Sequence, residues 1–345
     1  MSNLPHPCDF VRQVFQLHEL PNNVRLSHQF DNMRLCRLIR KTHKRFCNYI
    51  FGSPLVNSEG KFDYYRGGKA IEIKFNGLNA QYQALYEPHY KHGYEFETAV
   101  LLTRLLTGSN VFYDVGANWG YFSLLLAASP SFAGAIFAFE PNPSTCHDLT
   151  RTIQQAALDQ RITALNYGLG HHEGELHIEE PEKFKTGLCR LTPDGTGQRI
   201  PVHTLDSIDL APPGAIKIDA EGMEIDIFKG GEKTLRRHKP FIVFENFLCY
   251  EEPGRTWAPL ALLQEWGYRI FNPALMFDCG KESVLASYGD PLDQLLKRDS
   301  KPMTALVGIT AKNRFLMRNQ LNVFACHEDR LRELSASGFV QMSEF

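Results

Sequence analysis

Between residues 94 and 326, short apolar runs alternate with longer segments whose apolar residues recur at helical spacing. The apolar runs predict strands at residues 111–115, 135–140, 161–166, 215–219, 241–245, 268–271 and 322–326. The segments between them predict helices at residues 95–106, 121–128, 144–158, 223–237 and 259–266, with Ser144 as the cap of the third. Strands that are apolar on both faces and alternate with helices are typical of a parallel sheet covered on both sides. We therefore predict an α/β fold with a mostly parallel, doubly wound sheet.

The alternation breaks in two places. Residues 175–180 and 199–204 predict an inserted antiparallel strand pair, joined by a glycine-containing loop at 183–197. Residues 272–306 follow neither the helical nor the strand period and are expected to be irregular. We assign residues 91–330 to the sheet domain and residues 331–345 to a C-terminal tail.

Residues 1–90 differ in character and predict an α+β extension. A helix is expected from Asp31 to about Ile50, with apolar residues on one stripe. Its opposite face carries the basic residues Arg34, Arg37, Lys41, Lys44 and Arg45, which suit either a clamp for an anionic substrate or a solvated surface. Residues 61–66 and 69–75 flank Gly67-Gly68 and predict a β-hairpin. We expect this extension to form a lid or an acceptor platform outside the cofactor cleft.

Composition and charge narrow the class of protein. The 345 residues carry a formal net charge of −2, which gives no global field for attracting nucleic acid. No apolar run approaches the length of a spanning helix, and the N-terminus has no apolar leader. The eight cysteines include no Cys-x-x-Cys pair, so we expect no zinc knuckle and a reduced, cytoplasmic chain. Composition therefore gives no sign of a nucleic-acid partner, and the oligomeric state stays open.

The stretch from Val111 to Gly120 carries the clearest chemical signal. An apolar strand ends at Asp114 and Val115, and Gly116 and Gly120 then bracket a turn into a helix. Glycine allows the backbone to approach a ligand closely, and the helix N-terminus offers free N–H groups. Glu140 ends the next strand, where an acidic residue can accept hydrogen bonds from ribose hydroxyls. The two features together indicate a cofactor that contains a nucleoside.

The loop also discriminates between cofactors. It lacks the Gly-x-Gly-x-x-Gly pattern that holds a pyrophosphate, and Asp114 precedes it. A carboxylate repels phosphate but suits an ammonium group, so the loop favours S-adenosylmethionine over NAD. An NAD-dependent oxidoreductase on a similar fold stays an alternative, as does a non-catalytic cofactor-binding module.

Three blocks of the sequence resemble the FkbM-type methyltransferases, a class I, Rossmann-like family. They are Asp114–Gly120 (Asp-Val-Gly-Ala-Asn-Trp-Gly), Phe139–Pro143 (Phe-Glu-Pro-Asn-Pro), and Thr204–Asp206 followed by Ile216–Glu224. The resemblance implies S-adenosylmethionine-dependent methylation of a hydroxyl, often on a sugar, glycolipid or secondary metabolite. The residues then expected to bind the cofactor are Asp114, Gly116, Asn118, Gly120, Glu140 and Asn142.

Carboxylates late in the chain are the candidates for catalysis. Asp219 follows the predicted strand 215–219, Glu221 lies just beyond, and Glu245 ends the next strand. A hydroxyl is a weak nucleophile, so a base would help, and we expect Asp219 first and Glu221 second in that role. Asp219, Glu245 and Asn246 also offer three oxygen ligands for Mg²⁺, although the resemblance requires no metal. We favour a carboxylate that acts directly and predict no metal ligands.

Two further residues of these blocks have open roles. Lys217 lies inside a predicted strand and is expected to be a buried, paired cation. Trp119 lies in the glycine loop, where it either packs on the cofactor or on the helix that follows.

Overall fold

A computed structural model gives the fold of this chain. It describes residues 6–20, 59–87, 90, 92–179, 190–192, 197–220, 222–280, 282–287 and 292–342. The predicted helix at 31–50 with its basic face, most of the predicted loop at 183–197, and Glu221 lie outside the described residues.

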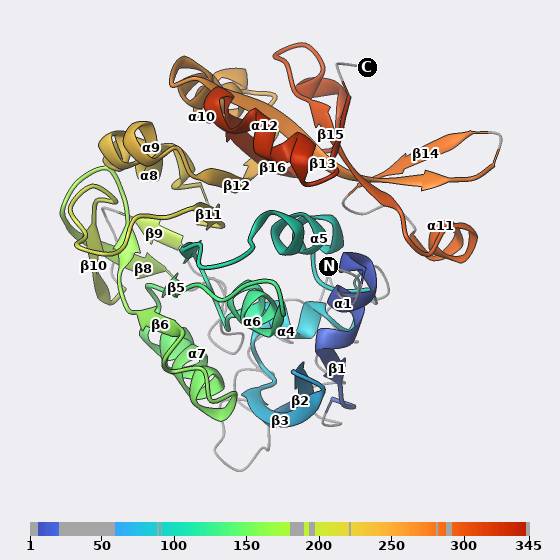
Figure 1. The fold of residues 1–345 in the computed structure, drawn as a ribbon. Helices are drawn as coiled ribbons and strands as arrows, with labels where there is room; N and C mark the ends of the chain where they lie inside the picture. Colours follow the sequence, from blue (N-terminus) through green and yellow to red (C-terminus); the bar gives the residue numbers. More distant parts are fainter. Residues whose placement is uncertain are drawn as a thin grey trace, which may run out of the picture.

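The main sheet has five adjacent parallel strands at its centre (Figure 1). Their order is β6 (Ile162–Leu165), β5 (Ile136–Phe139), β4 (Phe112–Val115), β11 (Ala215–Ile218) and β12 (Phe241–Phe247). The chain winds outward from β4 in one direction and from β11 in the other. The gap between the ends of β4 and β11 is therefore a topological switch point, where doubly wound sheets bind their ligands.

The sheet continues past β12 with a run of antiparallel strands. They are β16 (Gln320–His327), β13 (Tyr268–Asp278), β15 (Met303–Gly308) and, off the path, β14 (Ser283–Ala286). The expectation that 272–306 is irregular was wrong, because β13 runs on to Asp278 and pairs with β14 and β15. Residues 331–342, expected in a tail, form helix α12 (Leu331–Ala336) and edge strand β17 (Val340–Met342), which pairs with β15.

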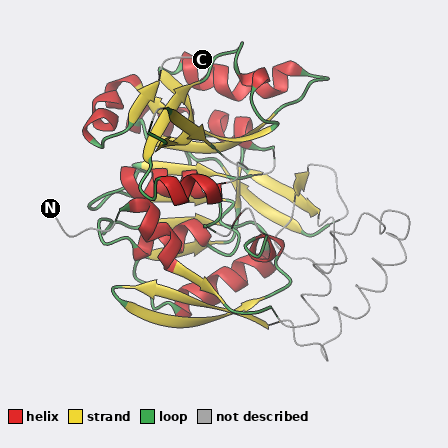
Figure 2. Ribbon diagram, turned by 90° about the vertical axis from the view of Figure 1, so that its right-hand side faces the viewer, coloured by secondary structure: helices red, strands yellow, loops and turns green. Residues whose placement is uncertain are grey.

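Helices cover both faces of the sheet, as a doubly wound fold requires (Figure 2). One face carries α5 (Phe96–Leu105), α6 (Tyr121–Ala128) and α7 (Pro143–Gln155), and the other carries α8 (Glu224–Gly230), α9 (Glu232–His238) and α10 (Pro253–Glu265). The single helix predicted at 223–237 is divided at Gly231, where a Cβ would lie 2.6 Å from Leu205 Cδ2. Asn142, not Ser144, caps α7, because its Oδ1 accepts the Ser144 N–H at 3.0 Å.

Short elements complete the described chain. A second sheet contains β7 (Gly168–Leu169), β8 (Gly174–Glu179), β9 (Arg190–Thr192) and β10 (Arg199–His203), with β8 and β10 antiparallel as predicted. Outside the N-terminal region, the remaining described helices are α11 (Leu292–Arg298) and the 3-10 turns η3 (Arg314–Leu316) and η4 (Glu328–Arg330). Among the described helices, none has the length and apolar character needed to cross a membrane.

The N-terminal region packs directly onto the sheet domain. Its described part consists of α1 (Pro7–Val14), β1 (Phe15–Leu17), the predicted hairpin β2 (Glu59–Arg66) and β3 (Lys69–Asn76), and α4 (Ala80–Ala84). The buried Trp119 ring lies 5.4 Å from the Phe62 ring and 5.5 Å from the Phe75 ring, measured between centroids. Trp119 therefore anchors the hairpin, and the extension shares one hydrophobic core with helices α5, α6 and α7.

Candidate functional site

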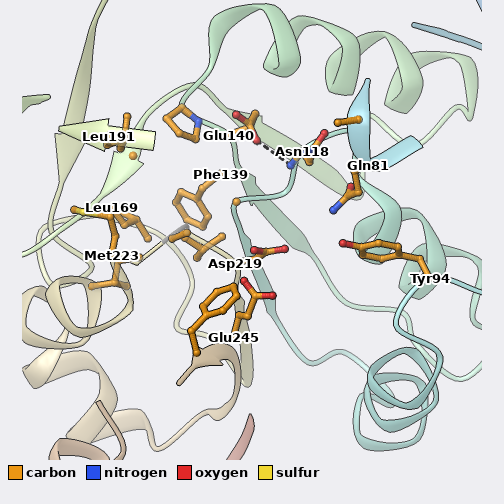
Figure 3. A pocket seen from close by; sticks show the side chains of 18 of the residues that line it. Gln81, Tyr94, Asn118, Phe139, Glu140, Leu169, Leu191, Asp219, Met223 and Glu245 are labelled. Atoms are coloured by element: carbon orange, nitrogen blue, oxygen red, sulfur yellow. Dashed lines mark hydrogen bonds between the residues drawn. The ribbon is translucent and has the colours of Figure 1, made fainter. Parts of the chain in front are cut away.

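A pocket of about 270 Å³ opens at the switch point (Figure 3). One end of it is mainly apolar and is lined by Phe139, Tyr167, Leu169, Leu191, Met223 and Ile227. The other end is polar and is lined by Gln81, Tyr94, Asp219, Glu245 and Gln320. Asn118 and Glu140 lie along the wall between these two ends, and Gly116 also lines the pocket. The pocket thus combines an apolar surface for a flat ring with an acidic surface for polar or cationic groups.

The glycine loop owes its shape to the neighbouring strand. Gly116, Asn118 and Gly120 all have positive φ, of 75°, 51° and 93°. A Cβ on Gly116 would lie 1.8 Å from the carbonyl oxygen of Asp219. Glycine is therefore needed here because the loop after β4 touches the end of β11, in addition to the ligand approach expected from the sequence. Gly120 begins α6, and a Cβ there would lie 2.6 Å from Leu149 Cδ1.

Glu140 is held in the pocket wall by two backbone groups. Its Oε2 accepts the N–H of Asn118 and its Oε1 accepts the N–H of Asn142, each at 2.9 Å. The side chain is only 5% exposed, and burial raises the pKa of Glu140 to about 7, although both N–H bonds act in the opposite direction. Each carboxylate oxygen keeps a further lone pair for a ligand hydroxyl.

The two asparagines expected to bind the cofactor act through Glu140. Asn142 gives Glu140 its N–H and caps α7 with its side chain, and it is not among the residues that line the pocket. Asn118 lines the pocket, and its Oδ1 accepts from Asn79 Nδ2 at 2.7 Å. The loop, the start of α7 and the N-terminal region thus converge on one carboxylate.

Asp114 lies behind the glycine loop and does not line the pocket. It is buried, and its Oδ2 accepts from the N–H and the hydroxyl of Ser123, at 3.1 and 2.7 Å. Burial raises the pKa of Asp114, while the positive charge of Lys217 counteracts that rise. The sequence placed this carboxylate next to the cofactor, but it serves the first turn of α6, because its side chain lies on the face of β4 that α6 covers.

Lys217 is a buried cation surrounded by carboxylates, as expected. Its Nζ lies 3.3 Å from Asp219 Oδ2 and 4.7 Å from the centre of the Phe122 ring. Burial alone would lower the pKa of Lys217, but the carboxylates of Asp219, Glu95, Asp114 and Glu245 raise it above its ordinary value. Lys217 therefore stays charged and orients Asp219, which lines the polar end of the pocket.

Glu245 and Asn246 do not converge with Asp219 as a set of three. Glu245 lines the pocket and accepts from Gln320 Nε2. Asn246 is the next residue of β12, and its side chain is held elsewhere: its Nδ2 donates to Thr256 O at 2.9 Å, and its Oδ1 accepts from Arg314 Nε at 2.6 Å. Successive residues of a strand point to opposite faces, so only Glu245 can reach the site. Within the described ranges, no group of three or more His, Cys, Asp or Glu residues could hold a metal ion.

Burial and neighbouring charges perturb Glu245. Together with the charges of Asp219 and Glu95, burial raises the pKa of Glu245 to about 9. Burial and these charges oppose the ionisation of Glu245, whereas Asp219 is paired with Lys217, so Asp219 is the better candidate for a base. The third predicted catalytic residue, Glu221, is outside the described residues.

Sequence reasoning missed Glu95 and the residues around it. Glu95 is 4% exposed, lies just before α5 and has a φ of 43°, which is rare outside glycine. Its carboxyl bonds to the side chains of Asn322 and Tyr94, yet its Oε2 has no hydrogen-bond partner in the described part of the chain. Burial raises its pKa to about 7. An acid at a helix start suggests only a dipole interaction, so no sequence signal marks its burial.

The N-terminal region also reaches the pocket. Gln81 of α4 lines the polar end beside Tyr94, and its Oε1 is buried without a hydrogen-bond partner among the described residues. The sequence predicted an extension outside the cofactor cleft, but residues of α4 share a pocket with Glu140. The sequence could not show this, because the contact depends on how the hairpin packs against Trp119.

Comparisons with known proteins show which proteins this chain is similar to. Residues 114–270 match the family model of the methyltransferase FkbM domain. The chain is similar to the hexuronic acid methyltransferase AglP of Haloferax volcanii, with 27% identity over 133 residues that cover 37% of this chain and 52% of that protein. The chain thus spans about half the length of this curated relative.

Two solved structures also resemble the chain. One is the methyltransferase FkbM of Methylobacillus flagellatus KT, with 18% identity, a TM-score of 0.35, and coverage of 55% of this chain and 52% of that chain. The other is M. jannaschii TYW2 in complex with AdoMet, with 11% identity, a TM-score of 0.37, and coverage of 79% and 86%.

Proposed function

We propose that this chain, whose residues 114–270 match the family model of the methyltransferase FkbM domain, is an S-adenosylmethionine-dependent methyltransferase that acts on a hydroxyl group. The observation that carries the proposal is the position of Glu140. Two backbone N–H groups hold its carboxylate in the pocket wall, between an apolar and an acidic end. A carboxylate so placed suits the two hydroxyls of a ribose.

The residues present fit S-adenosylmethionine better than a dinucleotide. Phe139, Leu169 and Met223 offer an apolar surface for adenine next to Glu140. Glu140, Asp219 and Glu245 line the pocket, and its described lining contains no lysine, arginine or histidine to bind a phosphate. These carboxylates oppose the pyrophosphate of NAD and favour a cationic ligand, which argues against the oxidoreductase alternative.

The chemistry at the polar end follows from Asp219. When bound, S-adenosylmethionine supplies a methyl group that is activated by the sulfonium charge. Asp219 would accept the proton of the acceptor hydroxyl, and Lys217, 3.3 Å from it, would keep its carboxylate oriented. Glu245 and Gln320 would bind further hydroxyls of the acceptor. Mg²⁺ has no part in this proposal, because Asn246 is held by Arg314 and Thr256.

The acceptor class we propose is a small molecule or glycan with several hydroxyls. Gln81, Tyr94, Glu245 and Gln320 present amide, phenol and carboxyl groups at one end of the pocket, and such groups bind hydroxyls. The name of the relative in Haloferax volcanii, a hexuronic acid methyltransferase, supports a sugar-like acceptor. The N-terminal region would form part of the acceptor platform through α4. The described cysteines are free, which supports the cytoplasm as the proposed compartment.

Binding and product analysis test this proposal. Calorimetry with S-adenosylmethionine and with NAD should show binding of the former alone. Incubation with methyl-labelled cofactor and a panel of sugars should then yield a product whose label survives mild alkali, as a methyl ether does. A base-labile label would indicate a methyl ester and hence a carboxylate acceptor. Binding of NAD alone would refute the proposal.

A further inference from the structure

The acidic groups near the polar end of the pocket outnumber the cation among them. Glu95, Asp114, Asp219 and Glu245 all interact electrostatically with Lys217, the one lysine in the core of this cluster within the described residues. We call these five residues the acid cluster. They come from four places in the chain: the start of α5, β4, β11 and β12. Four carboxyl groups beside one ammonium group leave negative charge uncompensated whenever more than one of them is ionised.

Glu95 is the member of the cluster with no role in the proposed chemistry. Its backbone is held in the left-handed region, which is strained for a residue other than glycine. One of its carboxyl oxygens is buried without a hydrogen-bond partner among the described residues. Strained backbone and unsatisfied buried groups concentrate at functional sites, so both features indicate that Glu95 serves a ligand rather than the fold.

The acid cluster acts on the polar end of the pocket. Asp219 and Glu245 line it, and Figure 3 shows their carboxyl groups side by side at the cavity. Glu95 does not line the pocket, but it interacts with Asp219 and with Tyr94, which both line it. In S-adenosylmethionine, a single methylene separates the sulfur from the ribose. A ribose on Glu140 therefore leaves the sulfur between Glu140 and the polar end, within the field of the cluster.

We propose that the acid cluster makes this pocket select the charged sulfonium of S-adenosylmethionine over the neutral thioether of S-adenosylhomocysteine, with release of a proton when the sulfonium binds. The inference rests on the proposed function and names what distinguishes substrate from product in that site. The two ligands share adenosine, ammonium and carboxylate groups, and they differ only in the methyl group and its positive charge. Selection by charge favours release of the product after each turnover.

The proton balance of this step is simple. A carboxylic acid of the cluster loses its proton to the buffer as the sulfonium arrives, and the carboxylate that forms faces the positive sulfur. No bond of the ligand changes. Glu95 and Glu245 are the donors, because both are buried, Glu245 lines the pocket, and burial beside Asp219 raises the pKa of each above its ordinary value.

Charged and polar side chains from several elements surround the carboxyl groups of these two donors. Glu95 faces Lys217 and Asp219 of β11, Asn322 of β16 and Tyr94. Glu245 faces Asp219, Glu95, Gln320 and Lys217. A carboxyl that ionises on binding makes the affinity for S-adenosylmethionine rise with pH up to its free-state pKa. The affinity for S-adenosylhomocysteine should rise only through the ionisation of Glu140, which both ligands share, so the ratio of the two affinities reports the acid cluster.

Calorimetry of the full chain tests the inference. Each ligand is titrated at one pH in two buffers of different ionisation enthalpy, which gives the number of protons released. We expect more protons to be released with S-adenosylmethionine than with S-adenosylhomocysteine, because any release from Glu140 is common to both ligands. The ratio of the two dissociation constants should rise about threefold to tenfold in favour of S-adenosylmethionine between pH 6 and pH 8.5, which is the size expected for one charge interaction that water partly screens.

Variants separate the cluster from other acids. Glu95→Gln should reduce the preference for S-adenosylmethionine by about threefold to tenfold and should remove part of the proton release. Glu97→Gln, a buried glutamate on the same helix, is the matched control and should leave both unchanged. If Glu95→Gln does not fold, Glu245→Gln gives the same comparison.

Two results would overturn the inference, and they differ from failure of the proposed function. Equal proton release with both ligands, or a parallel pH dependence of their affinities, would show that the sulfonium charge is not what the cluster detects. If neither ligand binds, the proposed function fails, and the inference fails with it.

Discussion

Replacing Glu140 by alanine tests the central element of the site. The carboxylate accepts two backbone N–H groups and has lone pairs left for the ribose. A hydrogen bond to a charged group contributes about 1.5–3 kcal/mol. Loss of the ribose bonds should therefore weaken S-adenosylmethionine binding by about 1–3 kcal/mol, or about fivefold to 150-fold in the dissociation constant.

The same substitution should also lower stability. The N–H groups of Asn118 and Asn142 would lose their acceptor in a buried site, and each unsatisfied group costs about 1–3 kcal/mol. Position 140 follows β5 directly, and a side chain at a strand end often contributes little to the stability of a fold. The hydrogen bonds instead predict a lower free energy of unfolding, because Glu140 joins the glycine loop to the start of α7.

Two measurements separate these effects. Calorimetry at pH 8, above the raised pKa of Glu140, gives the affinity of the ionised site. Urea unfolding without ligand gives the stability. Glu224→Gln is the matched control, because Glu224 is also buried and accepts a backbone N–H, that of Gly222 at 3.1 Å, but does not line the pocket. Unchanged affinity in Glu140→Ala would remove Glu140 from the cofactor site and refute the reasoning.

Further predictions concern the catalytic end and its support. Asp219→Asn should lower the rate of methyl transfer about 10²- to 10⁴-fold. Full activity of the wild-type protein in excess chelator would show that Asp219 acts without a metal. Normal turnover by the variant would exclude Asp219 as the base. The unfolding free energy of the wild type should fall as the pH rises from about 5 to about 9, because the raised pKa of Glu245 means that the folded state binds its proton more tightly. Glu245→Gln should flatten that dependence, and an unchanged slope would contradict the assignment. Asn246→Ala should lose about 1–3 kcal/mol of stability in urea unfolding, because it leaves the buried Arg314 guanidinium short of an acceptor; methyl transfer should continue in the folded fraction, whereas a metal role for Asn246 would abolish it.

The sequence by itself determined the elements that depend on local pattern. Apolar runs between helical segments predicted the five central strands, and Gly67-Gly68 predicted the hairpin of β2 and β3. The glycine loop and Glu140 were found because a tight turn and a strand end each leave a local signature. These features hold within a few neighbouring residues, so the sequence contains what is needed to infer them.

Tertiary structure decided which side chains meet in the site. Asp114 and Asn246 are polar residues at the right strand ends, but the faces of β4 and β12 direct them to Ser123 and to Arg314. Glu95 enters the acid cluster, and Gln81 reaches the pocket, only because α5 and the N-terminal hairpin pack against α6 and the glycine loop. Strand register and helix packing arise from contacts between residues far apart in the chain. Glu95, which no sequence pattern marks, therefore becomes a buried acid with a raised pKa. Asp114, which belongs to the glycine-loop motif, instead bonds to Ser123 in the first turn of α6.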